Sequence, residues 1–273
     1  MKLSIHPAER RYLILVITAV LASLFILIVA GASTATNLLF LLLGALVATV
    51  GFAIVRLLVR LKDFQRANYQ NIEAQMAILS IVKPRLPLPP TRGWAASPDF
   101  LAHVVREVKT RKPAVVAELG SGVSSIIVSY LLEQNQKGKL YSVDHEDWFL
   151  NQSLGNLEAH GLRQWVQPVY APLATMQLPE GSWKWYDHAA LEQIPAIDIL
   201  IVDGPPQTIQ KLARFPAMSV FANKFNPGAC ILVDDYARDD DTRMVDIWLE
   251  NFPDFSLEKF NTEKGTAILR KSN

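Results

Sequence analysis

The stretch Ala114–Ser125 reads A-V-V-A-E-L-G-S-G-V-S-S, and it decides the fold of this chain. A short apolar run ends in an acid and two glycines, and a helix-compatible segment, Ser124–Gln136, follows at once. This order predicts a strand, a tight turn and a helix whose free backbone N–H groups point at a ligand above the turn. Glycine at positions 120 and 122 allows a ligand to approach the bare backbone closely.

The turn differs from the two common nucleotide-binding loops. Ser125 stands where the dinucleotide fingerprint has its third glycine, and no glycine-lysine-serine phosphate loop is present. Glu118 lies two residues before the first glycine, where an acid can pair with a cationic group above the turn. The alternative is an ordinary strand-to-helix turn, because a single G-x-G is common in proteins. The rest of the chain must therefore identify the ligand.

Three later apolar runs also end in acids. They are K-L-Y-S-V-D at Lys139–Asp144, I-D-I-L-I-V-D-G-P-P at Ile197–Pro206 and A-C-I-L-V-D-D at Ala229–Asp235. The carboxyl ends of parallel strands meet at one edge of a sheet, where ligands of open α/β folds bind. Four strands with acids at this edge suit a cationic ligand that carries a sugar.

The order and spacing of E-L-G-S-G, V-D-H, V-D-G-P-P and L-V-D-D resemble the core of class I S-adenosylmethionine-dependent methyltransferases, over roughly residues 92 to 273. The resemblance implies an α/β fold with a Rossmann-like, seven-stranded sheet that is mostly parallel and has an antiparallel last strand. It implies S-adenosyl-L-methionine as cofactor. By the resemblance, the methionine part is held by Glu118, Gly120, Ser121 and Gly122, the ribose is held by Asp144, and the adenine lies near Ala171.

The remaining elements give the strand count that this fold requires. Trp165–Tyr170 is the predicted third strand, and Phe255–Phe260 with Thr266–Leu269 forms a closing hairpin through N-T-E-K-G. Helices are expected at His145–Leu162, at Gln207–Phe225 with a break at Pro216, and at Asp239–Asn251. The total of seven strands is a check that does not depend on the motifs.

Three acids are the candidates for the chemistry. Methyl transfer is an in-line displacement, and a hydroxyl acceptor must also lose a proton. Asp203, Asp234 and Asp235 end neighbouring strands, where their oxygens can hold one divalent cation. The chain resembles most the metal-dependent catechol O-methyltransferase branch, which carries Asp, Asp and Asn there, and this implies Mg²⁺. Without a metal, Asp203 or Asp234 is the expected general base. Pro206 replaces a lysine of the catechol enzymes, which argues against catechol as the substrate.

Aromatic residues are the candidates for the acceptor pocket. Trp94, in T-R-G-W-A-A-S-P, matches the segment that closes over cofactor and acceptor in the catechol branch. Tyr186 and His188 belong to the aromatic stretch G-S-W-K-W-Y-D-H-A, whose flat rings suit sugar or aromatic acceptors. The alternatives are that Trp94 anchors the preceding linker and that the other two residues pack in the core.

Two apolar runs predict a membrane hairpin. Tyr12–Gly31 and Leu38–Val55 contain no charge, and each is long enough to cross the hydrocarbon core as a helix. A cleaved signal peptide is the competing interpretation of the first run. Both flanks of the hairpin are basic, which predicts a cytoplasmic catalytic domain at the inner (plasma) membrane; these residues are Lys2, Arg10 and Arg11 before it, and Arg56, Arg60, Lys62 and Arg66 after it. The expected domains are a hairpin at 1–59, a juxtamembrane helix with a proline-rich linker at 60–98 and a methyltransferase domain at 99–273.

The composition of the chain limits which classes of partner are expected. The formal net charge of +1 gives no electrostatic case for nucleic acid, and the one cysteine excludes an intrachain disulfide. The hairpin favours an acceptor held at the membrane, such as a lipid-linked glycan or another envelope precursor. A soluble small-molecule acceptor and a catalytically silent scaffold are the two alternatives.

Overall fold

The computed structural model describes residues 7–29, 31 and 33–272, which form two compact units. The division falls between Tyr69 and Gln70. The last turns of the second helix and the proline-rich segment therefore belong to the same unit as the sheet.

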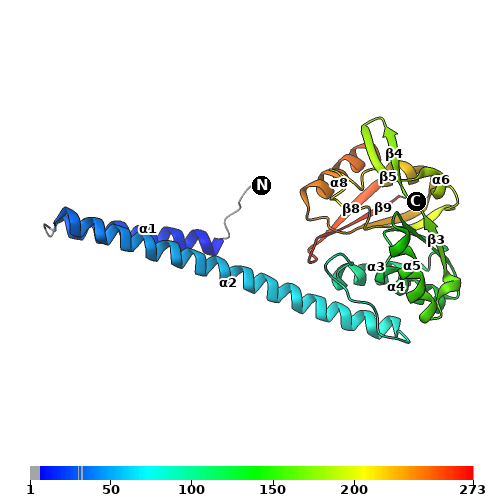
Figure 1. Ribbon diagram of the computed structural model, residues 1–273, viewed down its shortest axis with the longest axis horizontal. Coiled ribbons are helices and arrows are strands. Elements are labelled where there is room, and N and C mark those ends of the chain that lie inside the picture. Colours follow the sequence, from blue (N-terminus) through cyan, green and yellow to red (C-terminus); the bar gives the residue numbers. More distant parts are fainter. Residues whose placement is uncertain (1–6, 30, 32, 273) are drawn as a thin grey trace. The chain divides into compact units, whose positions relative to one another are not determined.

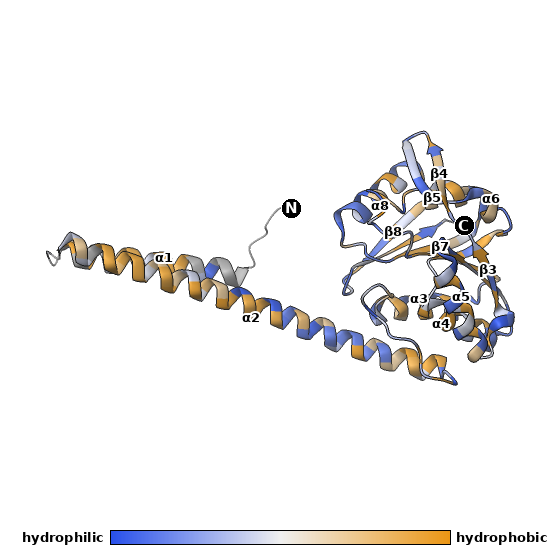
Figure 2. Cartoon of the chain, viewed as in Figure 1, coloured by the Kyte–Doolittle hydropathy of each residue, from blue (hydrophilic) through white to orange (hydrophobic). Residues whose placement is uncertain are grey.

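The first unit contains two apolar helices. Helix α1 spans Pro7–Val29, and helix α2 spans Thr34–Val82 and continues into the second unit. The two helices pack closely, because a β-carbon at Gly51 of α2 would lie 1.4 Å from the hydroxyl of Tyr12. Figure 2 shows the hydrophobic colour along the first half of α2 giving way to hydrophilic residues in the second half.

The described residues support one membrane span and not the two that the sequence predicts. Helix α2 is long enough to cross a bilayer and has a mean hydropathy of 2.7 over its most apolar window, none of which is buried. The qualifying apolar part of α1 is the shorter stretch Ile14–Ser23, which falls short of the ~20 residues that a span needs. Lys2, part of the predicted basic flank, lies outside the described residues.

The second unit is built on a mixed seven-stranded sheet in the order β3-β2-β1-β6-β7-β9-β8. Strands β1, β2, β3, β6 and β7 run parallel, and β9 pairs antiparallel with both β7 and β8. This confirms the predicted fold class. The strands, in sheet order, are β3 (Val166–Tyr170), β2 (Lys139–Asp144), β1 (Val115–Leu119), β6 (Ile197–Val202), β7 (Phe225–Val233), β9 (Thr266–Lys271) and β8 (Phe255–Phe260).

Helices lie on both faces of the sheet (Figure 1), and each face buries a hydrophobic core. One face is covered by α3 (Pro98–Arg111), α4 (Val123–Asn135) and α5 (Asp147–Ala159), and Ile78 and Val82 from the end of α2 join the same core. The other face is covered by a hairpin and by α6 (His188–Leu191), α7 (Pro216–Phe221) and α8 (Asp239–Asn251). Successive strand residues alternate between the two cores, which explains the unbroken apolar runs of β1, β6 and β7. Short 3-10 turns occur at Arg163–Trp165 and Ala222–Lys224.

The structure corrects the sequence prediction in two places. An antiparallel hairpin, β4 (Leu173–Leu178) and β5 (Gly181–Tyr186), is inserted between β3 and β6, and Trp183 and Trp185 of β5 point into the core. The helix expected from Gln207, with a break at Pro216, instead begins at that proline. The ring fixes the backbone dihedral for the first helical turn and has no N–H to leave unpaired, so Pro216 starts α7.

Candidate functional site

A cavity of about 520 Å³ opens at the carboxyl ends of β1, β2 and β6. Its volume lies in the range of roughly 300–1,000 Å³ that is typical of small-molecule and cofactor sites. The turn after β1 lines it, together with Asp144 after β2, Asp203 after β6 and Asp235 after β7; the turn residues are Gly120, Ser121 and Gly122. The structure thus brings acids from three of the four predicted strand ends to one cavity.

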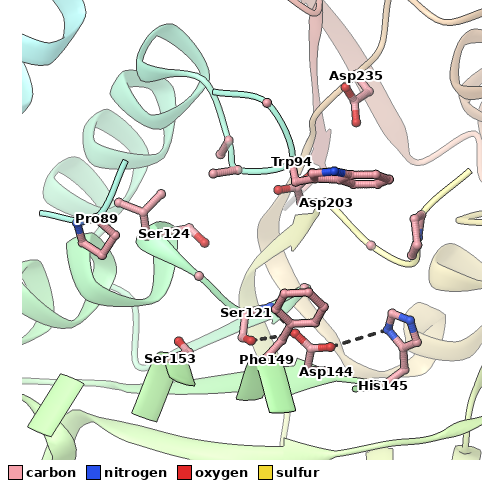
Figure 3. Close-up of a pocket in the computed structure, with 18 of the residues that line it drawn as sticks. Pro89, Trp94, Ser121, Ser124, Asp144, His145, Phe149, Ser153, Asp203 and Asp235 are labelled. Carbon is pink, nitrogen blue, oxygen red and sulfur yellow. Dashed lines mark hydrogen bonds and ion pairs between the residues drawn. The ribbon is translucent and has the colours of Figure 1, made fainter. Parts of the chain in front are cut away.

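Asp144 and the glycine turn hold each other in place. The carboxylate of Asp144 accepts hydrogen bonds from the backbone N–H of Ser121 at 3.0 Å and from its hydroxyl at 2.6 Å, as Figure 3 shows. A third bond comes from the backbone N–H of Glu146. Gly120 has a φ of +100°, a backbone conformation that residues with a side chain rarely adopt. The turn therefore needs glycine, and its backbone faces the cavity directly.

Glu118 lies beneath the turn and does not line the cavity. Its side chain is fully buried and accepts hydrogen bonds from the hydroxyls of Ser124, Ser125 and Ser142. Burial raises the pKa of the Glu118 carboxyl to about 7, although these hydrogen bonds favour its charged form. The expected pairing of Glu118 with a cationic group of the cofactor is not what this geometry shows, because the three serines already surround the carboxylate. Its place is structural: it ties the start of α4 to β1 and β2.

Three carboxylates form a cluster at the ends of β6 and β7. Asp203, Asp234 and Asp235 each offer one oxygen within 4.8 Å of the others, a spacing that a metal ion can bridge. The Asp234 side chain is fully buried, and neither of its oxygens has a hydrogen-bond partner among the residues that the structure describes. Figure 3 shows Asp235 at the opposite end of the view from Asp144.

Arg214 already supplies a cation to this cluster. Its guanidinium, only 4% exposed, lies 2.8 Å from the Asp235 carboxylate and 3.4 Å from that of Asp203. It also donates to the backbone carbonyl oxygens of Asp203 and Asp234. The donor set thus matches Mg²⁺ in type and spacing, and the Arg214 guanidinium contacts one oxygen each of two of its three members.

Burial controls how the cluster holds protons. It raises the pKa of the Asp203 carboxyl to about 6, with Arg214 opposing the rise and Asp235 adding to it. Burial also raises the pKa of Asp234 well above its ordinary value, and the neighbouring carboxylates of Asp203 and Asp235 reinforce this. A carboxylate that titrates near neutrality and lines the cavity has the properties of a general base. Asp203 has both properties, whereas Asp234 does not line the cavity.

Two of the three aromatic candidates for the acceptor pocket line the cavity, and the third does not. Trp94 is 85% exposed and lines the cavity, and Tyr186 lines it from the end of β5. The Tyr186 hydroxyl is buried without a hydrogen-bond partner among the described residues, and burial raises its pKa well above the ordinary value, so it is available as a donor. His188 begins α6, and Ala171 is fully buried after β3; neither lines the cavity.

Arg214 and Lys264 are two of the cavity-lining residues that sequence reasoning missed. Lys264 donates to the carbonyl oxygens of Gly93 and Ala95, and it lies 3.8 Å from the Asp234 carboxylate. It therefore connects the loop that carries Trp94 to the acid cluster. Lys264 belongs to the N-T-E-K-G turn, which is also a plain hairpin signal, and Arg214 stands in a stretch predicted as helix. Neither position carries a pattern that marks it as part of a site.

Comparison with known proteins agrees with the fold. Residues 117–236 match a family described as a methyltransferase domain. The fold is similar to that of the methyltransferase PaMTH1 from Podospora anserina, solved with S-adenosylhomocysteine bound, at 13% identity and a TM-score of 0.54 over 78% of this chain and 96% of that one. It is also similar to the O-methyltransferase TomG from Streptomyces achromogenes, solved with S-adenosylmethionine, at 14% identity and a TM-score of 0.49 over 73% and 89%.

A third similar structure is the O-methyltransferase from Bacillus cereus solved with S-adenosylhomocysteine, at 16% identity and a TM-score of 0.48, covering 75% of this chain and 91% of that one. A search of curated proteins by sequence gave no match.

The cavity suits S-adenosylmethionine by its own features. The backbone of the glycine turn faces it, Gly122 leaves open space where a side chain would stand, and the Tyr186 hydroxyl can donate to a bound ligand. Residues 117–236 match a methyltransferase domain, and these features of the cavity suit S-adenosylmethionine-dependent methyl transfer.

Proposed function

We propose that the protein is an O-methyltransferase that acts on a hydroxyl acceptor at the cytoplasmic face of a membrane. The observation that carries the proposal is the cavity in which the glycine turn after β1 meets Asp203 after β6. The turn supports the cofactor, and the acid stands where an acceptor hydroxyl must lose its proton. Asp144 and the Tyr186 hydroxyl would hold the cofactor's polar groups.

The reaction is an in-line displacement. Bound S-adenosylmethionine would supply a methyl group from its sulfonium, and the leaving group is neutral S-adenosylhomocysteine. Asp203 takes the proton of the acceptor hydroxyl as the oxygen–carbon bond forms and the carbon–sulfur bond breaks. A pKa of about 6 leaves Asp203 mostly ionised at neutral pH and still basic enough to share the proton in the transition state. A neutral amine can attack the methyl group without first losing a proton, whereas a hydroxyl needs a base. A base at this position therefore favours transfer to oxygen.

Helix α2 supports a membrane location. Its apolar first half is exposed along its length, for example at Leu42, Leu46 and Ile54, and exposed leucines in a water-soluble protein would be unfavourable. Basic residues follow directly at Arg56 and Arg60, and under the positive-inside rule they support a cytoplasmic catalytic unit. An anchored enzyme meets acceptors confined to the same surface, and a lipid-linked glycan or another envelope precursor has the required hydroxyls.

Methyl-labelled S-adenosylmethionine tests the proposal. Membranes that contain the full chain are incubated with the label, and the products are separated into lipid extract, glycan, protein and water-soluble metabolites. Membranes that contain Asp203→Asn serve as the control. We expect label in the lipid or glycan fraction only with the unaltered protein. Label in the water-soluble fraction would indicate a small-metabolite acceptor, and cofactor binding without transfer to any fraction would indicate a silent scaffold.

A further inference from the structure

The acid cluster raises the question of which cation balances it. Asp203, Asp234 and Asp235 are close enough to share one ion, and a divalent metal in oxygen-rich sites requires about six oxygen ligands. Such an ion needs carboxylate lone pairs that no other donor uses. The contacts of Asp203 and Asp235 therefore decide whether a metal can enter.

Arg214 donates to some of those lone pairs, so a metal ion would have to compete with its guanidinium. One terminal nitrogen of its guanidinium contacts both the Asp235 carboxylate, at 2.8 Å, and the Asp203 carboxylate, at 3.4 Å. The other nitrogen donates to the carbonyl oxygen of Asp234 at 2.9 Å and lies 3.7 Å from the carboxylate of Asp241. The guanidinium thus contacts both strand ends at once, as a bridging ion would.

Two further basic side chains lie next to the same acids. Arg238 pairs with Asp235 at 2.8 Å, and Lys264 lies 3.8 Å from Asp234 and 4.0 Å from Asp235. Three positive side chains therefore face the three carboxylates. A divalent ion would add two charges to a cluster that is already neutralised, and it would displace Arg214 into a buried position without its partners, which is unfavourable.

We propose that Arg214 takes the place of a divalent metal, so that methyl transfer at this site is metal-independent. The inference rests on the proposed function for its catalytic meaning. The guanidinium lines the cavity beside Asp203, and its fixed positive charge stabilises the oxyanion that develops on the acceptor as the proton leaves. Its part in positioning follows from its bonds to both strand ends, which hold Asp203 at the cavity wall.

Direct metal binding tests the inference without any substrate. The detergent-solubilised full chain is titrated with Mn²⁺, and free Mn²⁺ is measured by electron paramagnetic resonance. The unaltered protein and Asp235→Asn should both show no site filled below about 1 mM Mn²⁺. Arg214→Met, which keeps the bulk and removes the charge, should bind Mn²⁺ about tenfold tighter or more, and Arg214→Met with Asp235→Asn should lose that gain. Arg214→Lys keeps a cation and should remain without metal.

Stoichiometric Mn²⁺ binding by the unaltered protein that Asp235→Asn abolishes would overturn the inference. So would a folded Arg214→Met that gains no affinity for Mn²⁺. If Arg214→Met does not fold, the comparison of the unaltered protein with Asp235→Asn decides by itself. Where methyl transfer is detected, EDTA should change its rate less than about twofold, and a loss of more than about tenfold that Mg²⁺ restores would contradict the inference. The titration needs no transfer, so it separates failure of this inference from failure of the proposed function.

Discussion

Glu118→Gln measures what the buried acid beneath the glycine turn does. Burial raises its pKa from 4.5 to about 7, so between these values the folded protein holds a proton that the unfolded chain has released. Stability from this group is present at low pH and is lost as pH rises through about 7. The shift corresponds to about 3 kcal/mol. Glutamine is close in shape to the protonated acid and does not titrate.

Thermal unfolding of the full chain in detergent supplies the assay. At pH 5 the two proteins should unfold at similar temperatures, because both carry a neutral side chain at position 118. At pH 8 Glu118→Gln should gain about 3 kcal/mol relative to the unaltered protein, or about 6–12 °C for a domain of this size. Comparing the two proteins at each pH cancels the other acids whose pKa values are raised, such as Asp203 and Asp241.

Cofactor affinity gives the second readout. Because Glu118 does not line the cavity, Glu118→Gln should keep its affinity for S-adenosylmethionine within about threefold at pH 8. Ser142→Ala is a matched variant that removes one of the three hydroxyl partners without touching the turn. The reasoning would be refuted if the stability difference between Glu118→Gln and the unaltered protein were the same at pH 5 and pH 8. A loss of cofactor binding without any change in stability would show that the carboxylate contacts the cofactor after all.

Three further changes test other parts of the account. Asp203→Asn should lower kcat by about 10²–10⁴ with cofactor affinity kept, and the unaltered enzyme's rate should rise with pH through about 6; a flat profile below pH 7 would contradict this base. Tyr186→Phe should weaken cofactor or acceptor binding by about fivefold to tenfold in calorimetry, because it removes a buried donor that faces the cavity, while an unchanged affinity would remove Tyr186 from the site. Glu107→Gln should destabilise the protein by about 2–3 kcal/mol at pH 7, by about half as much at pH 3 and by little at pH 2 or below. Burial would raise the Glu107 pKa, yet bonds from Arg270 and Arg111 lower it to about 2, so this stability is present above about pH 4.5 and is lost as pH falls through about 2.

The sheet could be predicted because its strands carry two independent signals. Runs such as Ile197–Val202 are mostly apolar, which a strand buried between two layers requires, and an acid stands at or near the end of each. The hairpin β4–β5 was missed although Trp183, Lys184 and Trp185 alternate between core and solvent, because the stretch was interpreted as a pocket wall.

The site could be predicted only where it follows a strand. Asp144, Asp203 and Asp235 sit at strand ends, and topology alone brings them to one edge. Arg214 and the serines around Glu118 come from a loop, a helix and a neighbouring strand, and their meeting depends on tertiary packing that no local pattern encodes. The membrane prediction was wrong for α1: the helix covers Pro7–Val29, but its qualifying apolar stretch is only Ile14–Ser23.

Calorimetric titration of the full chain with S-adenosylmethionine tests the central claim most directly. The account predicts binding by the unaltered protein and a loss of about tenfold or more in Gly122→Val, whose side chain would project into the open space at the turn. Gly155→Ala is the matched control, because Gly155 also has open space around it but lies on α5 outside the cavity lining. Unchanged binding by Gly122→Val, or no binding by the unaltered protein, would contradict a cofactor site over the β1 turn.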